Sequence, residues 1–199
     1  MVTKRQEKER ELRKEHILEG ALTVFEEKGL EGATMDEIAR VSDFGKATLY
    51  YYFPSKEDVF CEILDRGWAT LWKSLEEVID SDKSPRESFI NILITIARKA
   101  QKNRNEYEFL FNAPQAITHI DDKDQVWKSY QQKLYSTLKE LLEDGIAQGQ
   151  FPKLDSDLMF KAIGGLFVGI IFMGEKNKDI TGSDIEKLLN QLITDPKQP

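Results

Sequence analysis

The stretch that decides the fold is TMDEIARVSDFGKATLYYYF, residues 34–53. Thr34 and Glu37 have the spacing of a capping box, in which a hydroxyl and an acid satisfy the free amides of a helix N-terminus. Pro54 follows directly and disfavours helical geometry at the residue before it. The pattern therefore predicts a short helix, a tight turn and a second short helix over about residues 46–53.

Apolar and polar residues of this stretch fall on opposite faces. We expect Ile38, Ala39, Leu49 and Phe53 to form a small core, with the apolar side chain of Phe44 filling it at the turn. The opposite face of the second helix presents Lys46, Ala47, Thr48, Tyr50 and Tyr51. Small side chains with one cation and two phenols suit the major groove of DNA. Lysine can reach a guanine edge or a phosphate there, and tyrosine a thymine methyl group or a phosphate oxygen. The alternative is that the tyrosines pack between two helices of an ordinary bundle.

Helical patterning continues through the rest of the chain, and no segment alternates like a strand. Further capping signals at Ser55–Asp58, Ser84–Glu87 and Ser183–Glu186 each precede an apolar helical run. The chain is therefore predicted to be all-α, with about nine helices. These are a helix that ends at Gly29, short helices after Thr34 and at about 46–53, a long helix after Ser55, and segments at about 85–103, 105–113, 122–148, 156–174 and 184–194.

A domain boundary is expected near residue 55. Residues 1–55 hold three helices and are below the size that usually folds unaided. Residues 56–199 form the larger bundle, and no flexible linker separates the two parts. We therefore expect them to be mechanically coupled.

Residues 13–60 resemble the DNA-binding domain of the tetracycline-repressor (TetR) family of bacterial transcriptional regulators. The resemblance is carried by Ile17, Ala21, Phe25, Gly29, Thr34, Ile38, Ala39, Lys46 and the run TLYYYFPSKEDVF, residues 48–60. It implies that residues 1–55 bind DNA and that residues 56–199 bind a ligand and dimerise. The implied DNA-binding residues are Thr34, Gly45, Lys46, Ala47, Thr48, Tyr50, Tyr51 and Lys56, of which Thr34 and Lys56 match phosphate contacts of the family.

Two positions depart from the family pattern. Asp43 stands where the turn glycine is usual, and Gly45 replaces the serine that caps the second helix. We expect the turn to survive, because Asp tolerates the left-handed conformation and Gly is an acceptable cap. A hydroxyl-to-phosphate contact at Gly45 is lost.

Charge is unevenly distributed. The formal net charge is −7, which argues against a general nucleic-acid coat. Residues 1–14, however, contain six Lys and Arg but only three Asp and Glu, which gives this segment a net positive charge. This basic arm either adds phosphate contacts or is a solvated helix extension stabilised by pairs such as Glu9–Arg13.

Large apolar and aromatic residues with a few polar ones mark the bundle. On spacing alone they are core residues, but the resemblance implies an effector cavity in this region. Candidate lining residues are Trp68, Trp72, Phe89, Leu93, Ile96, Phe109, Asn112, Trp127, Tyr130, Gln131 and Phe167. Because no cationic cluster accompanies them, we expect a neutral, apolar or aromatic effector.

The two C-terminal helices are expected to form the dimer interface. Glycines inside residues 156–174 permit close approach of a partner helix, although both helices could instead close the monomer's own core. Candidate interface residues are Phe160, Gly164, Phe167, Val168, Ile171, Leu188 and Leu192.

Other functions lack the necessary residues. One cysteine and two histidines leave no metal site, and we find no nucleophile–base pair, so no enzyme activity or cofactor is expected. The longest uncharged apolar stretch is too short to span a membrane, and no secretion signal is visible, so a cytoplasmic location is expected. The sequence favours a ligand-responsive repressor that binds a palindromic operator in double-stranded DNA as a homodimer. The alternative is a helical module that binds a small molecule or protein without DNA.

Overall fold

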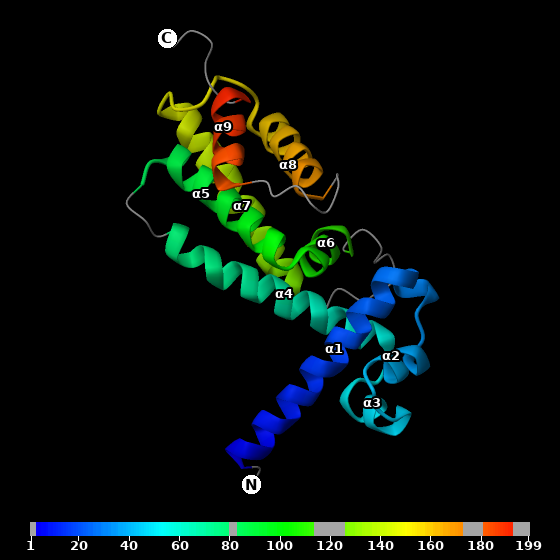
Figure 1. The fold of residues 1–199 in the computed structure, drawn as a ribbon. Coiled ribbons are helices and arrows are strands. Elements are labelled where there is room, and N and C mark those ends of the chain that lie inside the picture. Colours follow the sequence, from blue (N-terminus) through cyan, green and yellow to red (C-terminus); the bar gives the residue numbers. More distant parts are fainter. Residues whose placement is uncertain (1–2, 80–82, 114–125, 173–180, 193–199) are drawn as a thin grey trace. The chain divides into compact units, whose positions relative to one another are not determined.

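A computed structural model describes residues 3–79, 83–113, 126–172 and 181–192. Within these ranges the regular structure is helical, with no strand (Figure 1). The helices are α1 (Lys4–Gly32), α2 (Met35–Val41), α3 (Lys46–Tyr52), α4 (Lys56–Ile79), α5 (Pro85–Lys102), α6 (Arg104–Asn112), α7 (Val126–Ala147), α8 (Ser156–Phe172) and α9 (Gly182–Leu192). The predicted all-α fold with about nine helices is confirmed for the described residues.

The chain forms two compact units. The first comprises residues 1–67 and 109–127, and the second comprises residues 68–108 and 128–199. The division falls inside α4, which begins in the first unit and continues into the second. The boundary expected near residue 55 is where α4 begins, about three helical turns earlier.

In the first unit, α1, α2 and α3 enclose a small core (Figure 1). Ile17, Ile38 and Leu49 are completely buried. Gly20 permits the close approach of α1 to the end of α2, since an added Cβ would lie 2.8 Å from Cβ of Ser42. The Ser42 hydroxyl donates to the carbonyl of Ile38 at 2.6 Å, which satisfies a polar group at the buried end of α2.

Aromatic rings extend this core toward α4 and α6. The ring centroid of Phe60 lies 5.2 Å from that of Phe25 and 5.0 Å from that of Phe109. These edge-on contacts are favourable arrangements for aromatic pairs. The N-terminal part of α4 is thus packed into the same unit as α1, α2 and α3.

The second unit is built around α5, which packs against α8 and α9. The start of α5 has the predicted capping box between Ser84 and Glu87, with Pro85 at its first position. Arg86 then connects the start of α5 to the segment at Gln150 and to α9. Its guanidinium donates to the carbonyl of Gln150 at 3.1 Å and to Oδ1 of Asn190 at 2.9 Å.

Helix α8 has one buried and one exposed apolar row. Met159, Ile163, Phe167 and Ile171 recur every four residues and are buried within the second unit. Leu158 and Leu166 are 62% and 41% exposed, with Ala162 and Gly165 exposed between them. The exposed row is apolar although it lies at the surface.

Candidate nucleic-acid interface

The turn that precedes α3 has the predicted geometry. Asp43 adopts a φ of 56°, the left-handed conformation that Asp tolerates. The amide of Phe44 donates to the carbonyl of Ala39 at 2.9 Å, closing the turn. Gly45 is the N-cap of α3 with extended backbone and no side chain to cap the helix. The turn thus survives both departures from the family pattern.

The faces of α3 are divided as the sequence predicted. Leu49 and Phe53 are buried, whereas Tyr50 is 51% and Tyr51 71% exposed. Lys46, Ala47 and Gly45 are also exposed, and Thr48 is half-buried. Packing between helices therefore does not account for the two tyrosines within the described chain.

Charged partners surround this exposed face. The ammonium of Lys46 pairs with the carboxylate of Asp36 on α2. The guanidinium carbon of Arg10 lies 6.0 Å from the ring centroid of Tyr51, within reach of a cation–π interaction. Neither contact was predictable from local sequence patterns, because each joins residues on different helices.

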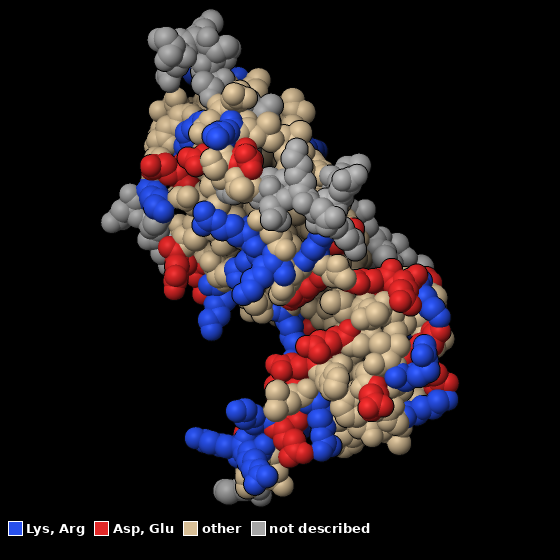
Figure 2. All heavy atoms as spheres, in the orientation of Figure 1, with Lys and Arg blue, Asp and Glu red and all other residues tan. Residues whose placement is uncertain are grey.

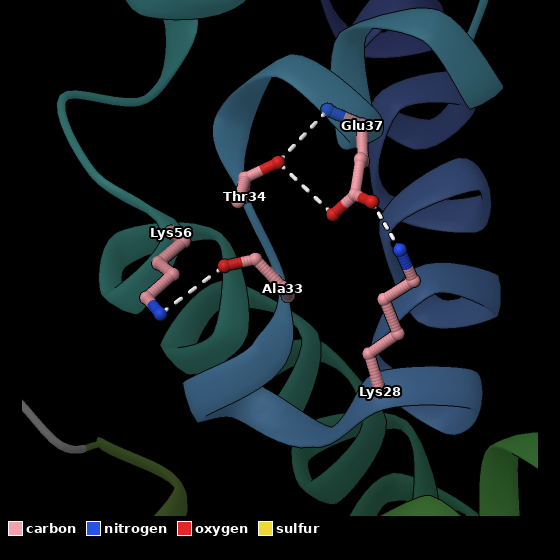
Figure 3. Close-up of polar contacts among 5 residues, drawn as sticks. All are labelled: Lys28, Ala33, Thr34, Glu37 and Lys56. Atoms are coloured by element: carbon pink, nitrogen blue, oxygen red, sulfur yellow. Dashed lines mark hydrogen bonds and ion pairs between the residues drawn. The ribbon is translucent and has the colours of Figure 1, made fainter.

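Thr34 holds the start of α2. Its hydroxyl oxygen accepts from the amide of Glu37 at 3.3 Å, and the hydroxyl donates to the Glu37 carboxylate at 3.0 Å (Figure 3). Glu37 also pairs with Lys28 of α1. Hydrogen bonds from Lys28 and Thr34 hold the pKa of the Glu37 carboxyl below its usual value. Thr34 is exposed.

Lys56 lies in the first turn of α4 and is half-buried. Its ammonium donates to the backbone carbonyls of Leu30 at 2.8 Å, Glu31 at 3.1 Å and Ala33 at 3.2 Å. Figure 3 shows the contact with Ala33, the residue just before Thr34. In this arrangement Lys56 contacts the last turn of α1 and its C-cap residue Ala33 instead of facing freely outward.

The basic arm is the N-terminal part of α1. Thr3 and Gln6 form a capping box at its start. Arg13 pairs with Glu9 at 2.7 Å, as expected for a helix extension, and Lys14 lies 3.7 Å from the Glu62 carboxylate. Figure 2 shows Lys and Arg gathered at the free end of this helix, at the bottom of the view. Both interpretations of the arm therefore remain predictions.

The candidate effector residues are distributed over both units. Trp68, Trp72, Phe89, Leu93, Ile96 and Phe167 are buried in the second unit. Tyr130 and Gln131 are half-buried there. Phe109, Trp127 and Asn112 belong to the first unit; the first two are buried, and Asn112 is exposed.

Three of the candidate dimer residues contact the interior of the second unit. Phe167 and Ile171 are in the buried row of α8, and the ring of Phe160 lies 5.5 Å from that of Tyr135 on α7. Gly164, Val168 and Leu188 are half-buried, and the side chain of Leu192 lies outside the described residues. Spacing alone did not identify the exposed row, because α8 is apolar on several sides.

Two short helices at a tight turn, with one face buried and a cationic, phenolic face exposed, define a helix-turn-helix protein of the DNA-binding class. Residues 17–63 match the sequence profile of the family described as "Bacterial regulatory proteins, tetR family". Residues 17–63 of this chain are therefore similar to the DNA-binding region of this family of transcriptional regulators.

Full-length relatives agree with this assignment. YhgD of Bacillus subtilis, an HTH-type transcriptional regulator, is 28% identical over 166 residues, which cover 82% of this chain and 85% of YhgD. The repressor KstR2 of Mycobacterium tuberculosis is 26% identical over 76% of both chains. These relatives are regulators and not enzymes, as expected here.

Solved structures share the fold. The ketosteroid transcriptional regulator KstR2 of M. tuberculosis superimposes with a TM-score of 0.76 at 21% identity, covering 92% of this chain and 95% of KstR2. AibR in complex with isovaleryl coenzyme A and operator DNA superimposes with a TM-score of 0.78 at 19% identity, covering 91% of this chain and 98% of AibR.

The described ranges hold neither a membrane-spanning helix nor a cluster of metal-binding side chains. None of the helices there combines the length and apolar character that a membrane span requires. Nor does that part of the chain bring together three His, Cys, Asp or Glu residues placed to hold a metal ion.

Proposed function

We propose that this protein is a cytoplasmic repressor that binds a palindromic operator as a homodimer and is released by a small effector. The observation that carries the proposal is the exposed face of Lys46, Tyr50 and Tyr51 on a helix whose opposite face is buried. Among the described residues this face is not covered by packing, and it matches the groups that DNA presents in its major groove.

Each exposed residue has a distinct role in the proposed complex. Lys46 reads a guanine edge or neutralises a phosphate, and the Tyr50 and Tyr51 hydroxyls and rings contact phosphate oxygens or a thymine methyl group. Gly45, Ala47 and Thr48 let the helix approach the bases closely. Thr34 contacts the DNA backbone beside α3.

Dimerisation supplies a second copy of α3, which binds the other half-site of the operator. Leu158, Ala162, Gly165 and Leu166 give α8 an exposed apolar row with small residues at its centre, which suits a partner helix at close range. We therefore place the centre of the interface on this row, with α9 beside it. Two copies of α3 about 34–36 Å apart would enter successive major grooves.

The effector is proposed to enter the aromatic core of the second unit. Trp68, Phe89 and Phe167 supply large apolar surfaces there, and the half-buried Tyr130 and Gln131 supply polar groups. KstR2 of M. tuberculosis is a ketosteroid transcriptional regulator, and AibR is in complex with isovaleryl coenzyme A; a ketosteroid and this coenzyme A ester both have an apolar part. The effector releases DNA only if it binds the DNA-incompetent arrangement more tightly.

Binding to a duplex selected from a randomised library by the wild-type protein tests the proposal. Lys46→Ala and Tyr50→Ala should each weaken binding to that duplex by at least about tenfold, the scale of a lost base or phosphate contact. Lys102→Ala, a change of an exposed lysine on α5, is the matched control and should bind normally. If the two α3 variants bind like the control, α3 is not the helix that recognises DNA.

A further inference from the structure

We infer that Arg86 is a positioning residue of the dimer, which holds α9 and the segment that leads into α8 in the arrangement that a second copy of this chain binds. The inference rests on the proposed homodimer with its interface on α8 and α9. The guanidinium donates through Nη1 to the backbone carbonyl of Gln150 at 3.1 Å and through Nη2 to Oδ1 of Asn190 at 2.9 Å. Gln150 lies between α7 and α8, and Asn190 lies in α9.

The two side-chain bonds of Arg86 use different nitrogens of one planar group. Because a guanidinium carries its N–H donors in a fixed fork, it holds its two acceptors at a fixed separation. The backbone of Arg86 adds a third bond, since its amide donates to Oε1 of Gln150 at 3.1 Å. A lysine at this position could donate to either acceptor, but its flexible ammonium would not set the distance between them.

The place of Arg86 in α5 indicates that its side chain serves these contacts and not the helix itself. Arg86 is the second residue of α5, after Pro85. The free amides there form the positive end of the helix dipole, which disfavours a cation. Burial also lowers the pKa of the Arg86 guanidinium, because it withdraws the charged group from water. Since neither effect favours an arginine, the favourable contributions come from its partners on the other segments.

The turn that receives Arg86 is itself firmly held. Gly149 adopts a φ of 70°, and the amides of Gln150 and Phe151 donate to the carbonyl of Gly145 at 2.7 and 3.2 Å. Phe151 is buried, and its ring centroid lies 5.4 Å from the guanidinium carbon of Arg86. An added Cβ at Gly145 would lie 2.4 Å from the Phe151 ring, so the ring fits closely against α7. Arg86 thus joins α9 to a turn of fixed geometry.

The two helices of the proposed interface depend on α5 for their placement, because α8 and α9 both pack on it. The exposed row of α8 leaves room for a partner helix. An added Cβ at Gly164 or Gly165 would meet no described neighbouring segment within 4 Å, so packing of the described chain does not require these glycines. Two interface helices that are fixed before association lose less conformational freedom when they bind. Loss of the Arg86 bonds should therefore weaken association of the two copies.

The dimer dissociation constant tests this role. We would measure it by sedimentation equilibrium for full-length wild type, Arg86→Met, Arg86→Lys and Asn190→Ala. The control is Arg98→Met, which removes an exposed cation from the same helix and should leave the constant unchanged. Arg86→Met and Arg86→Lys should each raise the constant by about tenfold, the scale of hydrogen bonds to a charged group. Asn190→Ala should raise it less, because the bonds to Gln150 remain.

A double variant and the unfolding free energy separate positioning from general stabilisation. Adding Asn190→Ala to Arg86→Met should raise the dissociation constant no further, because both changes remove the same bond. A residue that only stabilised the fold would lower the free energy of unfolding and leave association of the folded chains unchanged. An unchanged dissociation constant in Arg86→Met, or additive effects in the double variant, would overturn the inference. Asn190→Ala serves alone if Arg86→Met does not fold.

DNA binding provides a second measurement. Below its dimer dissociation constant, Arg86→Met should bind the selected duplex more weakly than wild type. Well above that constant it should bind equally, because α3 is unchanged. A deficit that persists at high protein concentration would overturn the inference, since the change would then act on the DNA-binding helices.

Amide hydrogen exchange distinguishes failure of the inference from failure of the proposed dimer. Exchange at Gln150, Phe151 and Asn190 should be faster in Arg86→Met than in wild type and unchanged in Arg98→Met. Equal exchange in Arg86→Met and wild type would overturn the inference. If wild type is monomeric at every concentration, the proposed homodimer fails, and the exchange measurement still decides whether Arg86 joins α9 to the turn after α7.

Discussion

Two exposed helix faces, one on α3 and one on α8, differ in chemistry. The α3 face carries a cation and two phenols, with Asp36 and Arg10 in contact with them. The α8 face carries Leu158, Ala162, Gly165 and Leu166. Exposure alone therefore does not indicate the partner. A face rich in hydrogen-bonding groups suits a polyanion, whereas an apolar face with small residues suits another apolar helix.

The largest effect is expected from adding charge to the α8 face. Leu158→Glu combined with Leu166→Glu should convert the dimer to a monomer, because two carboxylates would be buried without partners. Affinity for the selected duplex should fall by about a hundredfold or more, since each half-site would be bound singly. Light scattering measures the mass, and Lys161→Glu on the same helix is the control. A double variant that remains dimeric would move the interface away from this row.

On α3, truncating a side chain of the buried face should destabilise the protein much more than truncating one of the exposed face. Leu49→Ala should lower the free energy of unfolding by about 2–5 kcal/mol, because it leaves a cavity in a completely buried site. Tyr51→Ala should change it by no more than about 0.5 kcal/mol, as expected at the surface. Chemical denaturation of both variants measures this difference. Equal destabilisation would show that Tyr51 is a packing residue.

The Asp36–Lys46 pair allows a gain of DNA affinity to be predicted. Asp36→Asn frees the Lys46 ammonium and removes a negative charge from the DNA-facing surface. Binding to a duplex of random sequence should strengthen by about two- to fivefold at low salt, and the gain should shrink as salt rises. Fluorescence anisotropy measures it, with Asp144→Asn on α7 as a control. Unchanged affinity would show that Asp36 is remote from the bound DNA.

The smallest effect concerns two ion pairs in the same two units, Lys28–Glu37 between α1 and α2, and Lys139–Asp157 between α7 and the start of α8. Each pair lowers the pKa of its carboxyl, so its stabilisation is present above the unfolded-state pKa and is lost as pH falls through the folded-state pKa. Glu37→Gln should lower the melting temperature slightly at about pH 7 and have no effect at about pH 3. A difference that persists in acid would contradict this assignment.

Sequence patterns predicted the fold where local signals are strong. The capping box of Ser84 and Glu87, the left-handed Asp43 and the buried Leu49 follow from residues within one or two turns of each other. Such signals depend on backbone geometry that neighbouring residues determine. The helices and the exposed face of α3 were predictable for this reason.

Contacts between distant segments were not predictable. Nothing near Lys56 indicates that carbonyls 23–26 residues earlier are its partners. On α8, apolar residues occur on several sides, so spacing could not decide that Phe167 faces inward and Leu166 outward. Periodicity identifies an apolar face only where a polar face opposes it.

Selection of bound duplexes from a randomised library by the full-length protein tests the central claim most directly. We expect enrichment of an inverted repeat whose half-site centres are about 10 base pairs, or a multiple of that, apart. Recovery of no preferred sequence, or of a single asymmetric site bound by one copy of the chain, would contradict it.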